Sequence, residues 1–319
     1  MNENAIDYSA FQTNSLIILN EIKNLSSGLM QELEKVFGKL TVCKNEFTNC
    51  GVRHKRHPDG SITLDQDEYI KALIPIKHHE LSNAPSTPAS EELLSLYRSL
   101  LGAVAYAQLT QHQMACYIVA LQRVTHKLTV EDFKKLNMGT QKLKEAPVTL
   151  TYRPLKNLRD HEHLTVFSDA GFKKEELDGY ALRGGLYVRH SGKLYQDDGK
   201  PLGKALDCHV ILADSKSIKT VCRSTYAAEL LSATAATDML IPLSVTLYEL
   251  RYGPLGTDRL RSIRDDGWSV DDRIGTSVII DAKSVFESSY TTHRATFFKG
   301  TQNVISGLNE PDIKVIADL

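Results

Sequence analysis

The sequence predicts an α/β protein whose main part is a mixed sheet with helices packed against it. Beyond about residue 148, short runs rich in β-branched and aromatic residues are expected as strands: Thr149–Tyr152, Leu164–Ser168, Tyr180–Val188 and Asp207–Leu212. A long helical pattern follows over Thr225–Leu250, and a further strand is expected at 276–280. Strands, then a helix, then a strand is the order typical of a mixed sheet covered by helices.

The first half of the chain predicts smaller elements. Apolar residues recur at helical spacing over Leu19–Phe37, which predicts a helix there. Residues Phe47–Ile74 predict a hairpin that turns at Pro58-Asp-Gly60, followed by a helix from about Asp67. A polar linker over 81–92 precedes a buried helix pair at Leu93–Leu121. Thr129 is predicted as the N-cap of a helix that runs to about Lys144. Near the end, Gly253–Gly275 is expected as a loop with a short helix, and Pro311–Leu319 as the start of another helix.

Length and composition set broad limits. The 319 residues are enough for roughly two domains at about 150 residues each. The net charge of −1 argues neither for nor against a nucleic-acid partner. Residues 91–160 hold ten Lys or Arg against six Asp or Glu, an excess that points weakly to phosphates, although a solvated helix face is the commoner explanation.

Cysteine usage and hydropathy bear on location. The five cysteines form no Cys-x-x-Cys pair, and the chain opens without a signal-peptide pattern. The sequence reading finds no apolar stretch of membrane length. We therefore expect an intracellular protein, cytoplasmic or nuclear and not secreted, with no membrane partner.

Three carboxylates stand at positions from which they can meet. Asp169 ends the run Leu164-Thr-Val-Phe-Ser-Asp169, Glu229 falls in the first turn of the long helix, and Asp281 ends Ser277-Val-Ile-Ile-Asp281. Two strand ends and one helix start can converge on one point, where carboxylate oxygens suit a hard divalent cation. Each acid also has an ordinary explanation: a turn cap for Asp169, the helix dipole for Glu229 and an N-cap for Asp281.

Histidine supplies a second kind of candidate ligand. His78-His79 and His161-Glu-His163 could bind a metal ion, but plain surface histidines are the commoner explanation for such pairs. The runs Tyr195-Gln-Asp-Asp198 and Val270-Asp-Asp272 spell fragments of a polymerase signature without the apolar flanks it needs, so no polymerase activity is expected.

These motifs, taken in order, resemble the polyprotein of copia-type retrotransposons, at the end of its reverse transcriptase and over most of its ribonuclease H domain. The stretches that carry the resemblance are Leu33-x-x-x-Phe37, Gly60–Tyr69, Tyr97–Tyr106 with Leu109-Thr110, Phe133-Lys-Lys, Gln141-Lys-Leu-Lys, Phe167-Ser-Asp169-Ala170, Gly179-Tyr180, Gly184-Gly185, Lys219–Glu229 and Ile280–Ser284. The chain departs from the family pattern at Gln111-His112-Gln113, Ala227 and Ala282. The spacings between the three acids are also long.

The resemblance implies a fold, a site and a division of the chain. Residues 1–80 would be the end of a reverse-transcriptase palm, 81–160 a linker with a helical, thumb- or connection-like segment, and 161–319 a ribonuclease H-like domain cut short at its C-terminus. Asp169, Glu229 and Asp281 would be the catalytic acids and would bind two Mg²⁺ or Mn²⁺ ions. The substrate would be an RNA–DNA hybrid, and the upstream polymerase region of the same polyprotein would be the partner.

Two further readings stay open. A fourth acid is expected late in this family, and Asp318 is a poor candidate because it falls within a helical pattern, so that acid would lie beyond residue 319. The chain could then be a catalytically inactive or decayed fragment with residual nucleic-acid binding. A transposase or integrase with the same core is the third reading, against which the segment upstream of Asp169 argues.

Overall fold

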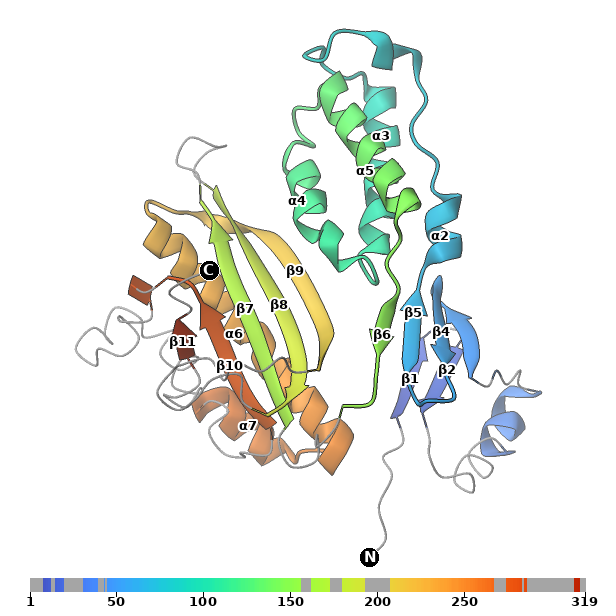
Figure 1. The fold of residues 1–319 in the computed structure, drawn as a ribbon, viewed down its shortest axis with the longest axis vertical. Helices are drawn as coiled ribbons and strands as arrows, with labels where there is room; N and C mark the ends of the chain where they lie inside the picture. The colour runs from blue at the N-terminus through green and yellow to red at the C-terminus, as the bar shows by residue number, and fades with distance from the viewer. Residues whose placement is uncertain are drawn as a thin grey trace, which may run out of the picture.

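The structure, a computed structural model, describes residues 8–12, 15–19, 31–39, 43, 45–155, 162–172, 180–192, 207–266, 274–282, 284–285 and 313–315. Its strands form three sheets, which have two, four and five strands within this described part. Figure 1 shows the five-stranded sheet beside a helical segment and the four-stranded sheet. The predicted mixed α/β architecture is confirmed.

The five-stranded sheet has the order β11-β10-β7-β8-β9. Its strands are β7 (Glu162–Gly171), β8 (Tyr180–Ser191), β9 (Cys208–Val221), β10 (Ile274–Ile280) and β11 (Ile313–Val315). Strands β7, β8 and β9 pair antiparallel, whereas β10 runs parallel to both β7 and β11. Ile280 of β10 lies level with Ser168 of β7, so the next residue of each strand, Asp281 and Asp169, comes out at the same end of the sheet.

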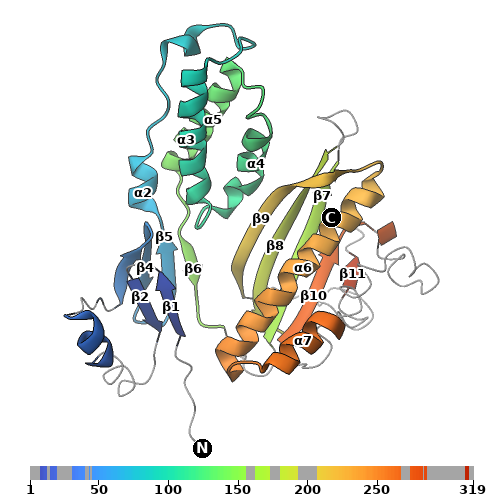
Figure 2. The ribbon, with the colours of Figure 1, turned by 180° about the vertical axis from the view of Figure 1, so that it is seen from behind.

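Helix α6 (Thr225–Tyr252) crosses one face of this sheet, as Figure 2 shows. Its N-cap is Ser224, whose hydroxyl accepts the backbone N–H of Ala227 at 3.2 Å. Ala236 and Leu240 of the helix pack against Leu164 and Val166 of β7 in one apolar cluster. This hydrophobic packing holds α6 against β7 and so determines where the first turn of the helix lies relative to the sheet.

Helix α6 corrects one expectation about hydropathy. By length and composition it is apolar enough to cross a membrane, with a mean hydropathy of 1.5 in its most apolar window. The reading that no stretch reaches membrane length is therefore wrong for this helix. The helix packs on β7, β8 and β10, and 33% of that window is buried inside the protein.

The four-stranded antiparallel sheet joins two parts of the chain that the sequence analysis separated. It consists of β3 (Glu46–Asn49), β4 (Val52–Arg56), β5 (Ile62–Asp65) and β6 (Leu150–Tyr152). The hairpin predicted around Pro58-Asp-Gly60 is confirmed between β4 and β5, where Gly60 takes a φ of +82° and Asp59 accepts the backbone N–H of Ser61. Strand β6 returns to pair with β5, with Leu150 opposite Leu64.

The helical segment lies between these strands in the sequence. It contains α2 (Asp67–Ala72), the short 3₁₀ turns η1 (His79–Ser82) and η2 (His112–Met114), and the helices α3 (Glu91–Ala107), α4 (Ala115–Arg123) and α5 (Val130–Glu145). The predicted helix pair and the helix capped by Thr129 are confirmed, and Thr129 forms a capping box with Asp132. An apolar core that includes Tyr97, Leu101 and Phe133 holds α3, α4 and α5 together.

The helical segment and β6 contact strands β8 and β9 of the five-stranded sheet. Gln108 donates to the carbonyl of Ala213 on β9 at 3.2 Å, and Tyr152 donates to the carbonyl of Val210 at 2.9 Å. Arg123 at the end of α4 donates to the carbonyl of Tyr180 at 3.1 Å. Polar groups thus cover part of an edge strand whose backbone would otherwise face solvent.

Two expectations about the chain's ends change. The sequence predicts one helix over Leu19–Phe37. Residues 31–37 are helical, whereas Leu19 belongs to β2 (Ser15–Leu19), which forms a hairpin with β1 (Tyr8–Gln12); residues 20–30 lie outside the described part. The helix expected over Pro311–Leu319 is wrong at 313–315, which form β11 beside β10. Val278, Ile279 and Ile280 of β10 give β11 a strand to extend, and such a pairing cannot be read from nine residues alone. Helix α7 (Thr257–Asp266) is the short helix expected within the polar loop.

Candidate metal centre

The structure brings the three predicted acids together. Asp169 lies near the end of β7, Asp281 follows β10, and Glu229 lies one turn into α6. Each offers a carboxylate oxygen, and these oxygens all lie within 4.8 Å of one another. We call these three residues the acidic cluster. The parallel register of β7 and β10 accounts for the two aspartates, and the packing of α6 on β7 accounts for the glutamate.

The three side chains differ in exposure. Asp169 and Asp281 are exposed, whereas Glu229 is buried, with 6% of its surface accessible. The backbone N–H of Ala170 donates to the Glu229 carboxylate, yet the buried Oε2 atom of Glu229 has no hydrogen-bond partner. A buried polar oxygen without a partner is uncommon and costly in a folded protein.

The electrostatics of the cluster are unfavourable for the protein alone. Burial, followed by the negative charges of Asp281 and then Asp169, raises the pKa of Glu229 to about 7. No Lys or Arg forms an ion pair with any of the three acids within the described part of the chain. Three converging carboxylates and one unsatisfied oxygen are the donor set that a hard divalent cation satisfies.

A serine that the sequence analysis passed over ties the glutamate to the strand. Ser232 lies three residues after Glu229 on the same face of α6 and is 1% exposed. Its hydroxyl donates to the backbone carbonyl of Asp169 at 2.7 Å and lies 3.0 Å from the hydroxyl of Ser168. The bond links the helix that carries Glu229 directly to the residue that carries the first aspartate. The signal that could have found it is a small polar residue one turn from a candidate acid.

The other sequence candidates divide between two outcomes. His78 and His79 lie together with Glu80 in a second group whose donor atoms are within 4.8 Å of one another. Several candidates fall outside the described residues: His161, Asp318 and the runs Tyr195–Asp198 and Val270–Asp272. His163, the partner of His161 in the sequence motif, is described, and its ring stacks on that of His190. Gln111, one of the departures from the family pattern, is fully buried and bonds both to the N–H and to the carbonyl of Val148.

Comparisons with known proteins give one structural similarity. No protein-family model matches the chain, and no curated protein matches it in sequence. The N-terminal RNase H domain of Rv2228c from Mycobacterium tuberculosis, solved as a fusion with maltose-binding protein, is similar with 14% identity and a TM-score of 0.26. The match covers 48% of this chain and 79% of that one. At a TM-score of 0.26 this similarity carries no argument about the chain, and the resemblance to copia-type polyproteins stays a prediction.

Proposed function

We propose that the chain is a ribonuclease H of the retroelement type, which hydrolyses the RNA strand of an RNA–DNA hybrid with the help of Mg²⁺ or Mn²⁺. The observation that carries the proposal is the acidic cluster: three carboxylates from two strand ends and one helix, with a buried glutamate oxygen that lacks a partner. A structural role would leave these charges unexplained, because the cluster costs stability unless a cation is bound.

The buried glutamate and the two exposed aspartates of the acidic cluster would have different roles. Glu229 is anchored inside by the Ala170 N–H and by the packing of α6, so it would hold a cation from the protein side. Asp169 and Asp281 are exposed, so their carboxylates can face both a cation and an incoming phosphodiester. Bound divalent cations would supply a Lewis acid that activates water and balances the charge of the phosphate. Without that charge, three carboxylates would repel the substrate.

The retroelement assignment rests on what precedes the cluster. Strands β3, β4 and β5 and then the helical segment precede the cluster, in the order in which the resemblance would have the end of the palm and the connection-like segment, and β6 returns after the helices to complete the four-stranded sheet. We propose that the polymerase region of the same polyprotein lies upstream and delivers the hybrid, in a cytoplasmic or nuclear setting. Contacts to the 2′-hydroxyls across the hybrid's minor groove would select RNA over DNA.

The second candidate function is a fragment that binds nucleic acid without cutting it. The observation that favours it is that the described cluster contains three acids, while the fourth acid of the family has no counterpart among the described residues. The strand β11 removes part of the case for this candidate, because the sheet has a fifth strand after β10. Hydrolysis therefore remains the function that the geometry supports best.

The test is cleavage of an end-labelled RNA–DNA hybrid by the full chain in Mg²⁺. We expect cleavage of the RNA strand, a loss of about 100-fold or more in the Asp169→Asn chain, and no change in Asp258→Asn, whose carboxylate is exposed on α7. Binding of the hybrid without cleavage by the unaltered chain would favour the second candidate. Cleavage that survives Asp169→Asn would show that the acidic cluster is not the active site.

A further inference from the structure

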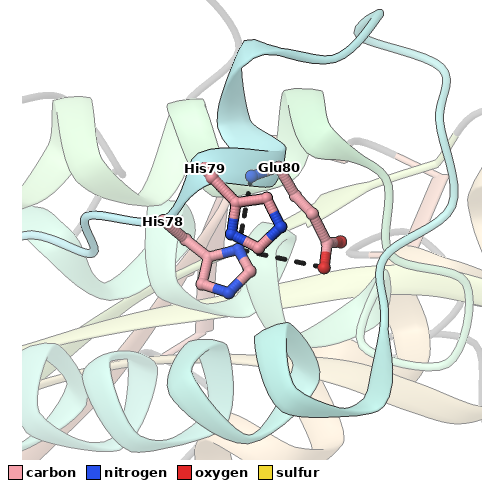
Figure 3. A group of neighbouring side chains, drawn as sticks. All are labelled: His78, His79 and Glu80. Carbon is pink, nitrogen blue, oxygen red and sulfur yellow. Dashed lines mark hydrogen bonds and ion pairs between the residues drawn. The ribbon is translucent and has the colours of Figure 1, made fainter.

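A second group of donor atoms lies far from the acidic cluster in the sequence, in the turn η1. His78, His79 and Glu80 are consecutive, and one donor atom from each lies within 4.8 Å of the others. We call these three residues the histidine turn. Figure 3 shows the two imidazole rings one above the other with the Glu80 carboxylate beside them. The ring centroids are 4.3 Å apart and the rings are tilted by 36°.

The histidine turn is held between two carboxylates and the start of α3. The Nδ1 atom of His78 lies 3.9 Å from Glu80 Oε1, and its Nε2 atom lies 3.9 Å from Glu92 Oε1. The His78 side chain is 10% exposed, although the turn itself is near the surface. Glu80 is oriented by the backbone N–H of Ser90, the N-cap of α3, which donates to its Oε2 at 3.4 Å.

The distances fit a bound ion better than a network of direct hydrogen bonds. At 3.9 Å, neither carboxylate oxygen is within hydrogen-bond range of the His78 ring, since such bonds lie near 2.7–3.2 Å. Two ligands at about 2.1 Å from a tetrahedral ion lie about 3.4 Å apart, so small side-chain rotations would close the group around an ion. The competing bond is weak: the Glu80 backbone N–H donates to His78 Nδ1 at 3.3 Å.

We propose that the histidine turn is a binding site for a divalent transition metal, with Zn²⁺ as the best fit. His78 Nδ1, His79 and Glu80 would be the protein ligands. Imidazole nitrogen selects zinc and its neighbours over Mg²⁺, which prefers oxygen ligands. Glu92 Oε1 lies 3.9 Å from the other nitrogen of His78, and a small rotation of this exposed side chain would let it accept that ring N–H, as outer carboxylates do at most metal-binding histidines.

The site would fasten the linker to the helical segment. His78 and Glu80 lie at the start of the linker, in and just before η1, while Ser90 and Glu92 lie at its end, where α3 begins. An ion bound by the turn would strengthen a closure that now rests on long hydrogen bonds and weak ion pairs. The role is structural, and it is independent of hydrolysis at the acidic cluster.

The test is calorimetric titration of the full chain with ZnCl₂ in excess Mg²⁺, which occupies carboxylate sites elsewhere. We expect one saturable Zn²⁺ per chain and an affinity that falls about tenfold or more in His79→Ala, a change at an exposed side chain. Glu92→Gln should weaken binding by about tenfold through the outer carboxylate. The matched control is His126→Ala, which removes an exposed histidine outside the turn and should leave the affinity unchanged.

The outcomes separate this proposal from the proposed hydrolysis. The Asp169→Asn chain should keep the Zn²⁺ site while it loses cleavage, and His79→Ala should keep cleavage while it loses Zn²⁺. Absence of saturable Zn²⁺ binding, or equal affinity in His79→Ala and the unaltered chain, would overturn the proposal. Circular dichroism of each variant checks that the fold is retained.

Discussion

The acidic cluster and the histidine turn assemble donor atoms over the same span in opposite ways. Each brings three donor atoms within 4.8 Å of one another. The members of the acidic cluster are 60 residues apart (169 to 229) and 52 residues apart (229 to 281), whereas those of the histidine turn are consecutive. The acidic cluster therefore forms only when β7, α6 and β10 are packed together, and the repulsion between its charges lowers the stability of the folded state.

Burial sharpens the contrast. Glu229 is buried with an oxygen that has no partner, while His79 is exposed and His78 accepts a hydrogen bond from the neighbouring backbone. A buried group without its ion is a standing cost to the fold, but an exposed one is solvated and costs little. Without metal, removing the Glu229 charge should therefore raise the free energy of unfolding, whereas removing a ligand of the histidine turn should hardly change it.

The largest expected effect comes from Glu229→Gln, which keeps the shape of the side chain and removes its charge. Cleavage should fall by about 100-fold or more, because a cation would lose its only buried ligand in the cluster. In EDTA at neutral pH, the same substitution should raise the free energy of unfolding, since the charge no longer repels Asp169 and Asp281. Cleavage assays and urea titrations measure the two effects. A loss of stability would contradict the repulsion.

The pH dependence of that stability has a defined sign. The pKa of Glu229 rises from an ordinary 4.5 to about 7 in the folded chain, so between these values the folded state binds more protons than the unfolded one. The Glu229 contribution to the free energy of unfolding is complete below pH 4.5 and is lost as the pH rises through about 7, at up to about 1.4 kcal/mol per pH unit. This slope should vanish in Glu229→Gln and persist in Glu131→Gln, whose carboxylate is exposed on α5.

The next largest effect should come from Ser232→Ala, which leaves all three carboxylates in place. The substitution removes the bond from Ser232 to the Asp169 carbonyl, at a cost of about 0.5–1.5 kcal/mol. Because α6 would then sit less firmly on β7, kcat for cleavage should fall by about tenfold with KM little changed. Ser244→Ala is the matched control, since this buried serine bonds only to Leu240 of its own helix. Equal effects of the two substitutions would exclude a positioning role for Ser232.

The convergence of the three acids could be predicted because each stood at an element boundary visible in the sequence. The β-rich run before Asp169, the apolar run before Asp281 and the Ser224 cap before the helix of Glu229 are all local signals. A parallel register between β7 and β10 then brings two of them level. The role of Ser232 had no such signal, because its partner, the carbonyl of Asp169, lies 63 residues away.

The predictions that fail concern elements that depend on distant pairing. Residues Ile313–Val315 have apolar spacing that suits a helix, but they form β11 because β10 offers an open edge. Leu19 is predicted in a helix with Phe37, but it pairs with Tyr8 in the hairpin of β1 and β2. The return of β6 to β5 likewise links residues 64 and 150, which the sequence placed in different segments. Local propensity cannot decide a strand whose stability comes from its neighbour.

A pair of glycine substitutions tests how far the acidic cluster depends on β10. Gly275 lies opposite His163 of β7, and a methyl group there would meet the His163 ring. Gly275→Ala should therefore push β10 away from β7, destabilise the chain by about 1–3 kcal/mol and lower cleavage through the displacement of Asp281. Gly102→Ala on α3 meets no atom within 4 Å and should stabilise by about 0.5–1 kcal/mol. Thermal unfolding distinguishes the opposite signs, and a neutral Gly275→Ala would contradict the close approach of the strands.

The smallest expected effect is that of His79→Ala without metal. The imidazole is exposed and its neighbours are held by other contacts, so the free energy of unfolding in EDTA should change by no more than about 0.5 kcal/mol. With Zn²⁺ in excess, the unaltered chain should gain stability by mass action, and His79→Ala should gain less. The comparison of the two sites predicts opposite patterns: removing a ligand helps the metal-free fold at Glu229 and leaves it unchanged at His79. A large loss at His79 in EDTA would mean that the histidine turn is part of the folding core, and the distinction between an assembled site and a local one would fail.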